Sequence, residues 1–314
     1  MPMLQKTYLV SSEDRTYPAK TNEISGSPED WLSNKLLSES NTLGLTFDFF
    51  VDWRINRISP YVWIKRILLP NYTYDEFIGK LDSEIEKEFG KDYLCRLGRF
   101  STEYRMQVQF IVFHDELDWS NDRSELIIVS LSFIEGRYSF SPQKYSLAEF
   151  KELIKFHSGG PVRIGSKKLK FSTSRLEYSL SMTDSLYPGD ADLILLNEDN
   201  KAICILEFKK HTLPTPVSEQ CLATYYGLDN RKYKRLALLR DYLASKSNSR
   251  ILFFVLYYPT RTNIEQQWKL EVLEGNAFSL RATDSFIFEL PADKSDNEYK
   301  KVIEKISQVI AARS

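Results

Sequence analysis

The sequence predicts a mixed α/β fold of the α+β type, with a β-rich first half and a second half in which helices and strands alternate. Two observations lead to this prediction. The first half contains four runs rich in β-branched and aromatic residues, which predict strands: TFDFFVDW, YVWIKRILL, RMQVQFIVFHDELDW and SELIIVSLSFIEG. In several of them, apolar residues alternate with a period of two, as they do in strands. They are interrupted by residues 74–89, whose apolar side chains recur at helical spacing, and preceded by a short helix predicted at PEDWLSNKLL.

The second half follows the segment SFSPQKYS and opens with a helix, SLAEFKELIKFH, that ends at a Gly-Gly-Pro breaker. The elements predicted after it are, in chain order, the strands LKFSTS, RLEYSLSM, ADLILL and KAICILEF, a helix over residues 216–243, and the buried strand ILFFVLYY. Within this arrangement we identify an α-β-β-β-α-β order, which uses three of these four strands, and the tail adds two strands and a last helix. The predicted domains are residues 1–145, a β-rich accessory or recognition domain, and residues 146–314.

Composition narrows the class of protein. The chain has 314 residues, of which 42% are hydrophobic, 13% aromatic and 27% charged, a profile typical of a folded protein. The longest apolar run, residues 251–258, is far below the ~18 residues of a membrane helix, and the first residues lack the apolar region of a signal peptide. Three scattered cysteines form neither a zinc spacing nor a disulfide framework. We expect a cytoplasmic protein with no membrane partner.

The formal net charge of −1 does not by itself indicate a nucleic-acid-binding protein. Locally, however, two basic clusters stand out, one over residues 163–175, which includes Lys168, and one over residues 231–240. Solvated surface explains each cluster alone as well as a binding face does. The aromatic and basic segment DWRINRISPYVWIKR is equally open to both interpretations.

The most informative stretch is GDADLILLNEDNKAICILEFKKH, residues 189–211. Alternate side chains of a strand share a face, so Glu207 and Lys209 lie on one face of the second strand. If the two strands pair through the NEDN turn, Asp192 at the start of the first lies close to Glu207. Two neighbouring carboxylates repel each other, and a hard divalent cation such as Mg²⁺ or Mn²⁺ relieves that repulsion. A lysine beside them suits metal-assisted phosphodiester hydrolysis.

The Glu-x-Lys pattern is weak on its own, and this chain contains two further examples, at Glu149–Lys151 and Glu298–Lys300. Both fall in predicted helices, where side chains two residues apart do not share a face. Only Glu207 and Lys209 end a strand that follows a strand led by an aspartate. No P-loop, dinucleotide-binding glycine motif or serine-nucleophile elbow is present, and His114, His157 and His211 lack a zinc spacing.

The pattern Pro188–Asp192 followed, after fourteen residues, by Glu207-Phe208-Lys209 resembles the PD-(D/E)xK, or restriction-endonuclease-like, nuclease superfamily. The resemblance covers about residues 147–260. It implies that the αβββαβ core carries Asp192 and Glu207 as metal ligands and Lys209 as the catalytic lysine, with Asp190 as the alternative aspartate. Relatives of one subgroup carry Gln-x-x-x-Tyr on the next helix. Here Tyr225 lies one position too far from Gln220, which remains a helper near the metal or phosphate.

An acidic residue from a helix often completes the site in this superfamily, and Glu152 is the residue assigned here as a third metal ligand. Glu149 is an equal candidate, and Glu177 a weaker one. The residues predicted to contact nucleic acid are Lys168, Lys210, Tyr225, Arg231, Lys234 and Arg235, because basic side chains that alternate with aromatic ones can follow a phosphate backbone.

The sequence therefore predicts a Mg²⁺- or Mn²⁺-dependent nuclease. By resemblance, DNA is favoured over RNA as the substrate, and genome defence or repair is the expected setting. A homo-oligomer or an activating protein partner stays open. A non-catalytic nucleic-acid-binding or assembly protein that retains the fold is the alternative. In a third interpretation the hairpin is purely structural, with Lys209 forming a salt bridge at a sheet edge.

Overall fold

The computed structural model describes residues 2–163, 169–262 and 266–313, with the backbone alone over residues 226–229. The chain forms two compact units, each built from two segments. Unit 1 contains residues 1–19 and 47–190, and unit 2 contains residues 20–46 and 191–314. These units do not follow the boundary expected at residue 145, because residues 20–46 belong with the C-terminal part of the chain and residues 146–190 with the N-terminal part.

Unit 1 is an α+β structure built on a mostly antiparallel sheet. Its strand order is β3 (Leu43–Asp52, from Phe47 onward), β4 (Arg57–Leu68), β5 (Gln107–Phe113), β6 (Glu125–Ile134) and β7 (Arg137–Ser146), and β1 (Leu4–Lys6) pairs with β4. Only β4 and β5 run parallel among these described pairs. Three helices connect β4 to β5, namely α3 (Tyr74–Gly79), α4 (Leu81–Phe89) and α5 (Lys91–Tyr104). The sequence predicted the first two as one helix and did not predict α5.

The segment SFSPQKYS is strand and not a boundary between domains. It forms most of β7, which pairs with β6 along its whole length through a two-residue turn at Glu135 and Gly136. Both turn residues have positive φ angles, 50° and 79°, as the tight hairpin turns that match strand twist require. Pro142 is tolerated because β7 is an edge strand in the described sheet.

The predicted strand RLEYSLSM is a helix, α7 (Arg175–Ser181), and the expected strand before it is reduced to β8 (Phe171–Ser172), which pairs with β2 (Val10–Ser11). Ser174 begins the helix by accepting a hydrogen bond from the backbone N–H of Glu177, three residues on. Leu176 and Leu180, four residues apart, are both fully buried. The Ser-x-x-Glu cap and the helical spacing of the two leucines outweigh the alternation of apolar and polar residues that suggested a strand.

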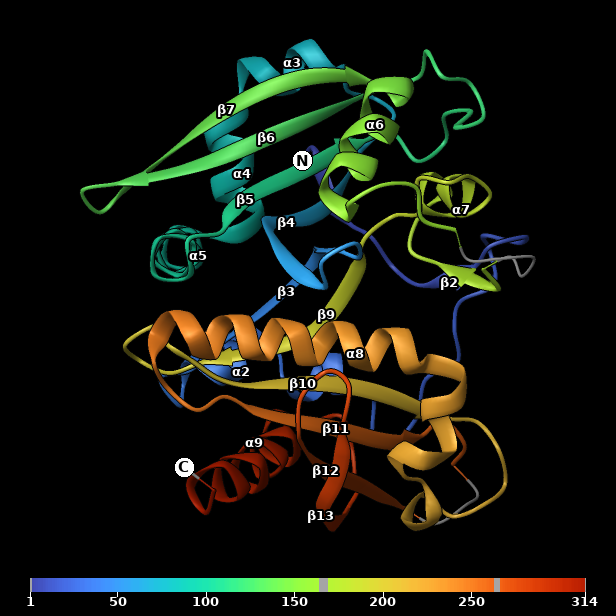
Figure 1. The fold of residues 1–314 in the computed structure, drawn as a ribbon, viewed down its shortest axis with the longest axis vertical. Coiled ribbons are helices and arrows are strands. Elements are labelled where there is room, and N and C mark those ends of the chain that lie inside the picture. The colour runs from blue at the N-terminus through green and yellow to red at the C-terminus, as the bar shows by residue number, and fades with distance from the viewer. Residues whose placement is uncertain (1, 164–168, 263–265, 314) are drawn as a thin grey trace. The chain divides into compact units, whose positions relative to one another are not determined.

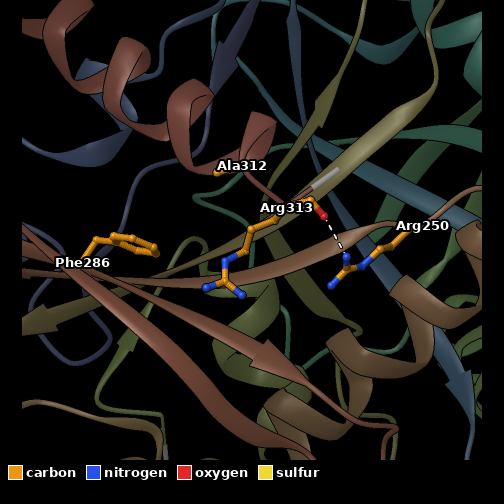
Figure 2. Close-up of a pocket in the computed structure, with 4 residues that line it drawn as sticks. All are labelled: Arg250, Phe286, Ala312 and Arg313. Atoms are coloured by element: carbon orange, nitrogen blue, oxygen red, sulfur yellow. Dashed lines mark hydrogen bonds between the residues drawn. The ribbon is translucent and has the colours of Figure 1, made fainter.

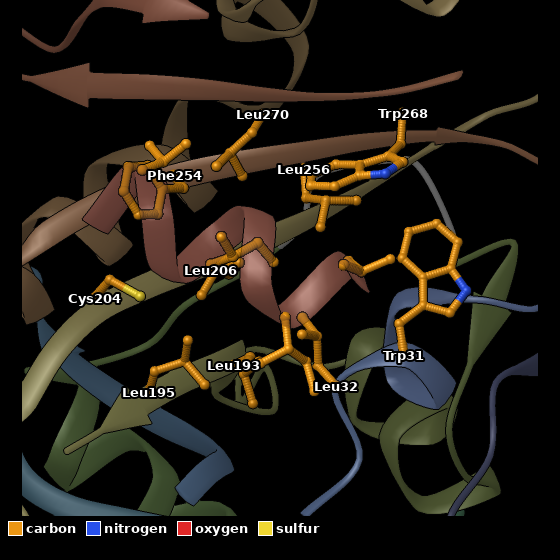
Figure 3. Packing of buried hydrophobic residues seen from close by; sticks show 14 of the residues in the cluster. Trp31, Leu32, Leu193, Leu195, Cys204, Leu206, Phe254, Leu256, Trp268 and Leu270 are labelled. Atoms are coloured by element: carbon orange, nitrogen blue, oxygen red, sulfur yellow. The ribbon is translucent and has the colours of Figure 1, made fainter. Parts of the chain in front are cut away.

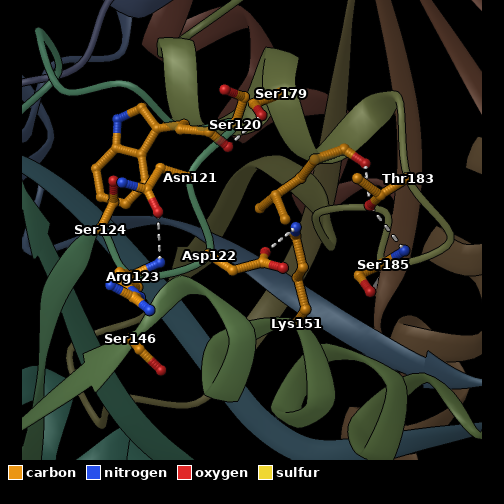
Figure 4. A network of polar contacts seen from close by, with 12 residues as sticks. Ser120, Asn121, Asp122, Arg123, Ser124, Ser146, Lys151, Ser179, Thr183 and Ser185 are labelled. Atoms are coloured by element: carbon orange, nitrogen blue, oxygen red, sulfur yellow. Dashed lines mark hydrogen bonds and ion pairs between the residues drawn. The ribbon is translucent and has the colours of Figure 1, made fainter.

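Helix α6 (Leu147–Ser158) is confirmed, and it packs on the aromatic core of unit 1. Phe150 stacks on Trp63 of β4 with ring centres 4.8 Å apart. On its outer side, Lys151 forms an ion pair with Asp122 at 2.6 Å, within the polar network drawn in Figure 4. In the same network, the hydroxyl of Ser179 on α7 donates to the carbonyl of Trp119. These contacts tie α6 and α7 to the loop before β6.

Unit 2 is also α+β, and its sheet carries the strands of interest. Its elements, in chain order, are α1 (Pro28–Trp31), α2 (Asn34–Ser38), the start of β3, β9 (Gly189–Leu196, from Ala191 onward), β10 (Ala202–His211), the short 3₁₀ helix η1 (Val217–Glu219), α8 (Leu222–Ser247), β11 (Leu252–Pro259), β12 (Gln267–Glu274), β13 (Arg281–Glu289) and α9 (Asp296–Ala311). The strand order is β13-β12-β11-β10-β9-β3. Strands β10 and β11 are parallel and joined through α8, which runs along β10 in Figure 1.

One face of this sheet forms a large hydrophobic core of unit 2. Leu193, Cys204, Leu206 and Phe254 point to this side, together with Trp31 from the N-terminal segment (Figure 3). Trp31 is fully buried, and its indole N–H donates to the carbonyl of Ser25. The intervening residues of β9 and β10 therefore face the other side, where α8 packs. No helix among the described residues is both long and apolar enough to cross a membrane.

Candidate functional site

The β9–β10 hairpin brings the predicted carboxylates together. The strands are antiparallel, with Leu206 opposite Leu193, so the next pair along the register is Glu207 and Asp192. Asn200 takes the positive φ of 63° that the NEDN turn requires. One carboxylate oxygen of Asp192 accepts a hydrogen bond of 2.7 Å from the backbone N–H of Phe208, which fixes this side chain against the neighbouring strand. The predicted pairing of Asp192 with Glu207 is thus present.

Glu207 is completely buried, and neither of its carboxylate oxygens accepts a hydrogen bond from the described residues. Its charge is instead balanced by two ammonium groups. Lys232 Nζ lies 2.8 Å from Glu207 Oε1, and Lys209 Nζ lies 3.8 Å from the same oxygen. A buried carboxylate without hydrogen bonds is costly unless a cation lies beside it. The buried carboxylate of Glu207 is therefore stabilised by a cation at this point.

Lys232, on α8, also approaches the second carboxylate, with its Nζ 3.6 Å from Asp192 Oδ2. It thus links the two acidic side chains of the hairpin. The sequence analysis placed Lys232 in a basic cluster and did not assign it to the site. The available signal was its neighbour Tyr233, which is fully buried on α8 together with Leu236 and Ala237. Lys232 borders these buried residues, and the β10–α8–β11 crossover lays it over the strand carrying Glu207.

Lys209 lies on the same face of β10 as Glu207 and is largely buried, with 14% of its side chain exposed. Its ammonium lies 5.3 Å from the ring centre of Tyr225 and 5.5 Å from that of Tyr233. Aromatic faces attract cations at this range, so both tyrosines help to hold the ammonium beside Glu207. The predicted neighbours Glu207 and Lys209 are therefore in contact.

Gln220 is buried and is linked to Glu207 through Tyr225 and Lys209. The Tyr225 hydroxyl donates a 2.9 Å hydrogen bond to Gln220 Oε1, and Gln220 Nε2 donates to the carbonyl of Pro216 at 3.3 Å. Lys269 in turn donates to the Gln220 carbonyl at 2.7 Å. Gln220 thus fixes Tyr225, which lies under Lys209, and the structure gives it a positioning role. The direct role of Gln220 near a metal or phosphate stays a prediction.

The helix-borne acidic residues belong to unit 1. Glu152 is exposed on α6 and forms an ion pair with Lys155 at 2.9 Å. Glu149 caps the same helix by accepting hydrogen bonds from Ser146, and these bonds hold the pKa of Glu149 below its usual range. Glu177 accepts hydrogen bonds from the backbone and hydroxyl of Thr173. The assignment of Glu152 as a metal ligand therefore stays a prediction.

Asp190, the alternative aspartate, also falls in unit 1, where it is exposed and its charge acts on a second cluster of charged side chains. Lys65 Nζ lies 3.4 Å from Asp48 Oδ2 and 3.6 Å from Glu177 Oε2. Burial raises the pKa of Asp48 to about 7 against the opposing effect of Lys65, and the charge of Asp190 raises it further. Asp192, not Asp190, is the residue linked to Glu207 through a shared lysine.

The basic residues predicted to contact nucleic acid are only partly gathered on one surface. Arg231 is exposed, Lys234 and Arg235 are half-buried on the same helix, and Lys234 lies over the exposed ring of Phe278 at 4.3 Å. Lys210 is half-buried on β10, and Lys168 lies outside the described residues. Arg240, counted in the same cluster, is buried and bonded to Asp241 and to the carbonyl of Gly275, so it does not belong to a binding face.

Comparison of the chain with protein-family models, with curated proteins and with solved structures finds no match. The chemistry of the site must therefore be argued from its own geometry. A cavity elsewhere in unit 2 offers no competing site (Figure 2). It is lined by Arg250, Phe286, Ala312 and Arg313, and its arginines already form ion pairs with Glu274 and Asp284.

The residues present fit a divalent cation. Two carboxylates converge, the oxygens of one of them are buried without hydrogen bonds, and an ammonium already lies between the two. Within the described ranges, no group of three or more His, Cys, Asp or Glu side chains could hold a metal. Such a group is not required for Mg²⁺, which binds through one or two carboxylates and completes its coordination with water and phosphate oxygens.

Proposed function

We propose that the protein is a divalent-metal-dependent nuclease that hydrolyses phosphodiester bonds, with DNA favoured over RNA as its substrate. The observation that carries this proposal is the convergence of Asp192, Glu207 and Lys209 on the face of the hairpin that α8 covers. Two strands from one hairpin supply two carboxylates and a lysine at the spacing that the resemblance to the PD-(D/E)xK superfamily implies.

The arrangement of unit 2 supports the same proposal. Its element order α2, β3, β9, β10, α8, β11 is the αβββαβ order expected of a restriction-endonuclease-like core. In this order, β9 carries Asp192 as the second core strand and β10 carries Glu207 as the third. Residues 47–190, which form most of unit 1, are inserted between the first and second core strands. The helix and strand pair proposed from the sequence for the start of the core lie inside that insertion.

In the proposed reaction, Asp192 and Glu207 would hold a Mg²⁺ or Mn²⁺ ion, which would supply Lewis-acid polarisation of the phosphate and would lower the pKa of a water. Lys209 remains beside Glu207, where its ammonium stabilises negative charge that develops on the phosphate oxygens or orients the attacking water. Tyr225, held by Gln220, limits the movement of Lys209. The largely buried setting of these groups strengthens each electrostatic contact relative to bulk water.

The exposed part of α8 suits a phosphate backbone. Arg231 and Lys234 lie on the helix that also contributes Lys232 and Tyr225 to the site. Side chains of this kind bind phosphates without reading sequence, and the affinity they provide falls as salt concentration rises. We assign Arg231, Lys234, Arg235 and Lys210 to contacts with the substrate backbone.

The test is cleavage of labelled single- and double-stranded DNA and RNA in Mg²⁺, Mn²⁺ or EDTA. Metal-dependent cleavage that falls at least about a hundredfold in Asp192→Asn and in Lys209→Ala is the expected result. Glu298→Gln and Lys300→Ala are matched controls, because they alter the Glu-x-Lys pattern of α9 and leave the hairpin intact. Cleavage that survives in both hairpin variants would place the activity elsewhere.

A non-catalytic nucleic-acid-binding or assembly protein is the second candidate, and one observation favours it. Lys232 already pairs with both carboxylates and Lys209 adds a second positive charge beside Glu207, so the cluster can be stable as an internal ion-pair network without any metal. That function predicts no binding of Mn²⁺ at the hairpin in calorimetry. It also predicts unchanged nucleic-acid binding in Asp192→Asn.

A further inference from the structure

The position of Lys232 points to a control on metal binding. We propose that Lys232 is an internal counter-cation, which holds Asp192 and Glu207 together when no metal is bound and is displaced when a divalent cation enters. This inference rests on the proposed function, because it assigns a competitor to the same two carboxylates. It gives a role to a residue that neither the Glu-x-Lys pattern nor the preceding aspartate identifies.

The contacts of Lys232 carry the inference. Its ammonium is the nearest described positive charge to Glu207, at 2.8 Å, whereas Lys209 lies 3.8 Å from the same oxygen. It also lies 3.6 Å from Asp192, so one ammonium serves both prospective metal ligands. Glu207 is fully buried and its oxygens accept no hydrogen bond within the described chain. A single positive charge at this point therefore does what a divalent cation would do, which is to relieve the repulsion between two carboxylates.

The ammonium and a metal ion cannot share this position. A Mg²⁺ ion binds carboxylate oxygens at about 2.1 Å, so a lysine still paired with the same oxygen would leave two cations only a few ångströms apart. Their repulsion is large in a largely buried setting. Lys232 is able to leave, because 25% of its side chain is exposed and its flexible stem carries a compact charge. Metal binding is thus an exchange of one cation for another.

The released ammonium has a chemically suitable destination in a nucleic-acid phosphate. An anionic backbone lying on α8 would attract Lys232 away from the carboxylates and so raise their affinity for the metal. By thermodynamic reciprocity, a bound metal would raise the affinity for nucleic acid by the same factor. The exchange therefore couples metal binding to the presence of substrate and keeps the metal affinity of the substrate-free protein low.

The deciding experiment is calorimetric titration of Mn²⁺ into the 314-residue protein and four variants. Lys232→Met keeps the stem and removes the charge, and Lys232→Arg keeps a charge. Lys246→Met is the matched control, because Lys246 is exposed on the same helix, and Asp192→Asn removes a ligand. We expect Lys232→Met to bind Mn²⁺ on the order of tenfold more tightly than the wild type. Lys246→Met should match the wild type, Lys232→Arg should gain nothing, and Asp192→Asn should bind weakly.

A wild-type measurement guards against a variant that does not fold. In ¹⁵N spectra of the lysine side chains, the Lys232 signal, assigned by its loss in Lys232→Arg, should move on addition of Mg²⁺. If the wild type and Lys232→Met bind Mn²⁺ with equal affinity, and Asp192→Asn abolishes that binding, the proposed cation exchange is overturned. The nuclease proposal would then still stand. Weaker binding in Lys232→Met would also overturn it. Absence of binding in every protein would overturn the proposed function itself.

Discussion

His157, on α6, shows how a single buried side chain ties the stability of unit 1 to pH. Its ring packs between Tyr61 and Phe50, with ring centres 4.0 and 5.1 Å away, and its Nε2 has no hydrogen-bond partner in the described residues. Burial lowers the pKa of His157 from 6.5 to about 4. The unfolded chain therefore takes up a proton before the folded chain does. The contribution of neutral His157 to the free energy of unfolding is fully present above about pH 6.5 and is lost as the pH falls toward 4.

We predict that His157→Phe reduces the acid sensitivity of the protein. Between pH 7.5 and pH 5, the histidine should cost about 2 kcal/mol of unfolding free energy, and the variant should not show that loss. Urea denaturation at the two pH values measures the difference and is independent of any constant effect of the substitution on packing. An equal loss in the wild type and the variant would mean that another group controls this pH range.

The residues of the candidate site were predictable to different degrees. Asp192, Glu207 and Lys209 lie within one hairpin, so strand alternation and a short turn were enough to bring them together. Lys232 lies more than twenty residues further on, and its place depends on how α8 rotates about its own axis when it packs on β10. That rotation is set by the buried face around Leu236, which a local pattern of lysines and arginines does not reveal.

At the scale of the element, the β6–β7 hairpin depends on one glycine. Gly136 has a φ of 79°, and no atom lies within 4 Å of the position that an added Cβ would take. We predict that Gly136→Ala lowers the free energy of unfolding by about 1 kcal/mol through backbone strain alone. The measurement is chemical denaturation under the conditions used for the wild type.

Gly79, in the last turn of α3, is the matched control. It too has no atom within 4 Å of an added Cβ, but its φ is not positive. Alanine there should raise the free energy of unfolding by about 0.5 kcal/mol, because it removes conformational freedom from the unfolded chain. The same sign of change at both glycines would contradict the explanation by φ.

The elements that were predicted correctly have long, uniform patterns. Examples are the apolar run of β11 and the helical spacing of α9. The segment that became α7 misled because Leu176, Tyr178 and Leu180 alternate with polar residues as in a strand, while the decisive signal was one capping serine with a glutamate three residues later. The secondary structure of a short element depends on such capping residues, and propensities averaged over a window of residues do not detect them.

At the scale of the whole molecule, unit 2 needs both of its segments. Trp31, Leu36 and Leu37 come from residues 20–46 and are almost completely buried in the core that β9 to β12 form. We predict that residues 191–314 alone do not fold cooperatively, since losing these three side chains removes about 5 kcal/mol or more of burial free energy. Near-ultraviolet circular dichroism and thermal denaturation measure this.

The control is residues 20–46 joined by a short Gly-Ser linker to residues 191–314. Thr46 Oγ1 donates a 2.9 Å hydrogen bond to the carbonyl of Asp192, so the two ends to be joined are already adjacent. This joined chain should fold cooperatively. A cooperative transition of residues 191–314 alone would show that residues 20–46 are not required for unit 2 to fold.

The division of the chain could not be predicted, because sequence patterns are local and the insertion is not. Each strand of unit 1 has the same alternation whether it belongs to a separate domain or to an insertion. The expected boundary at residue 145 followed a change in composition near Pro142, which in the structure only reflects an exposed edge strand. The burial of Trp31 beside Tyr258 and Trp268 is one of the long-range contacts that show that these segments belong together.

This interrupted order has a consequence for how the protein is made on the ribosome. Residue 46 is separated from residue 191 by 144 intervening residues, 47 to 190, all of which belong to unit 1. At translation rates of ~5–20 residues per second, the segment with Trp31 waits on the order of ten seconds for its partner strands. Unit 1 is complete first, while Trp31, Leu36 and Leu37 of this segment stay exposed to water and available for aggregation. Slow translation before residue 191 would lengthen that exposure and lower the yield of folded protein.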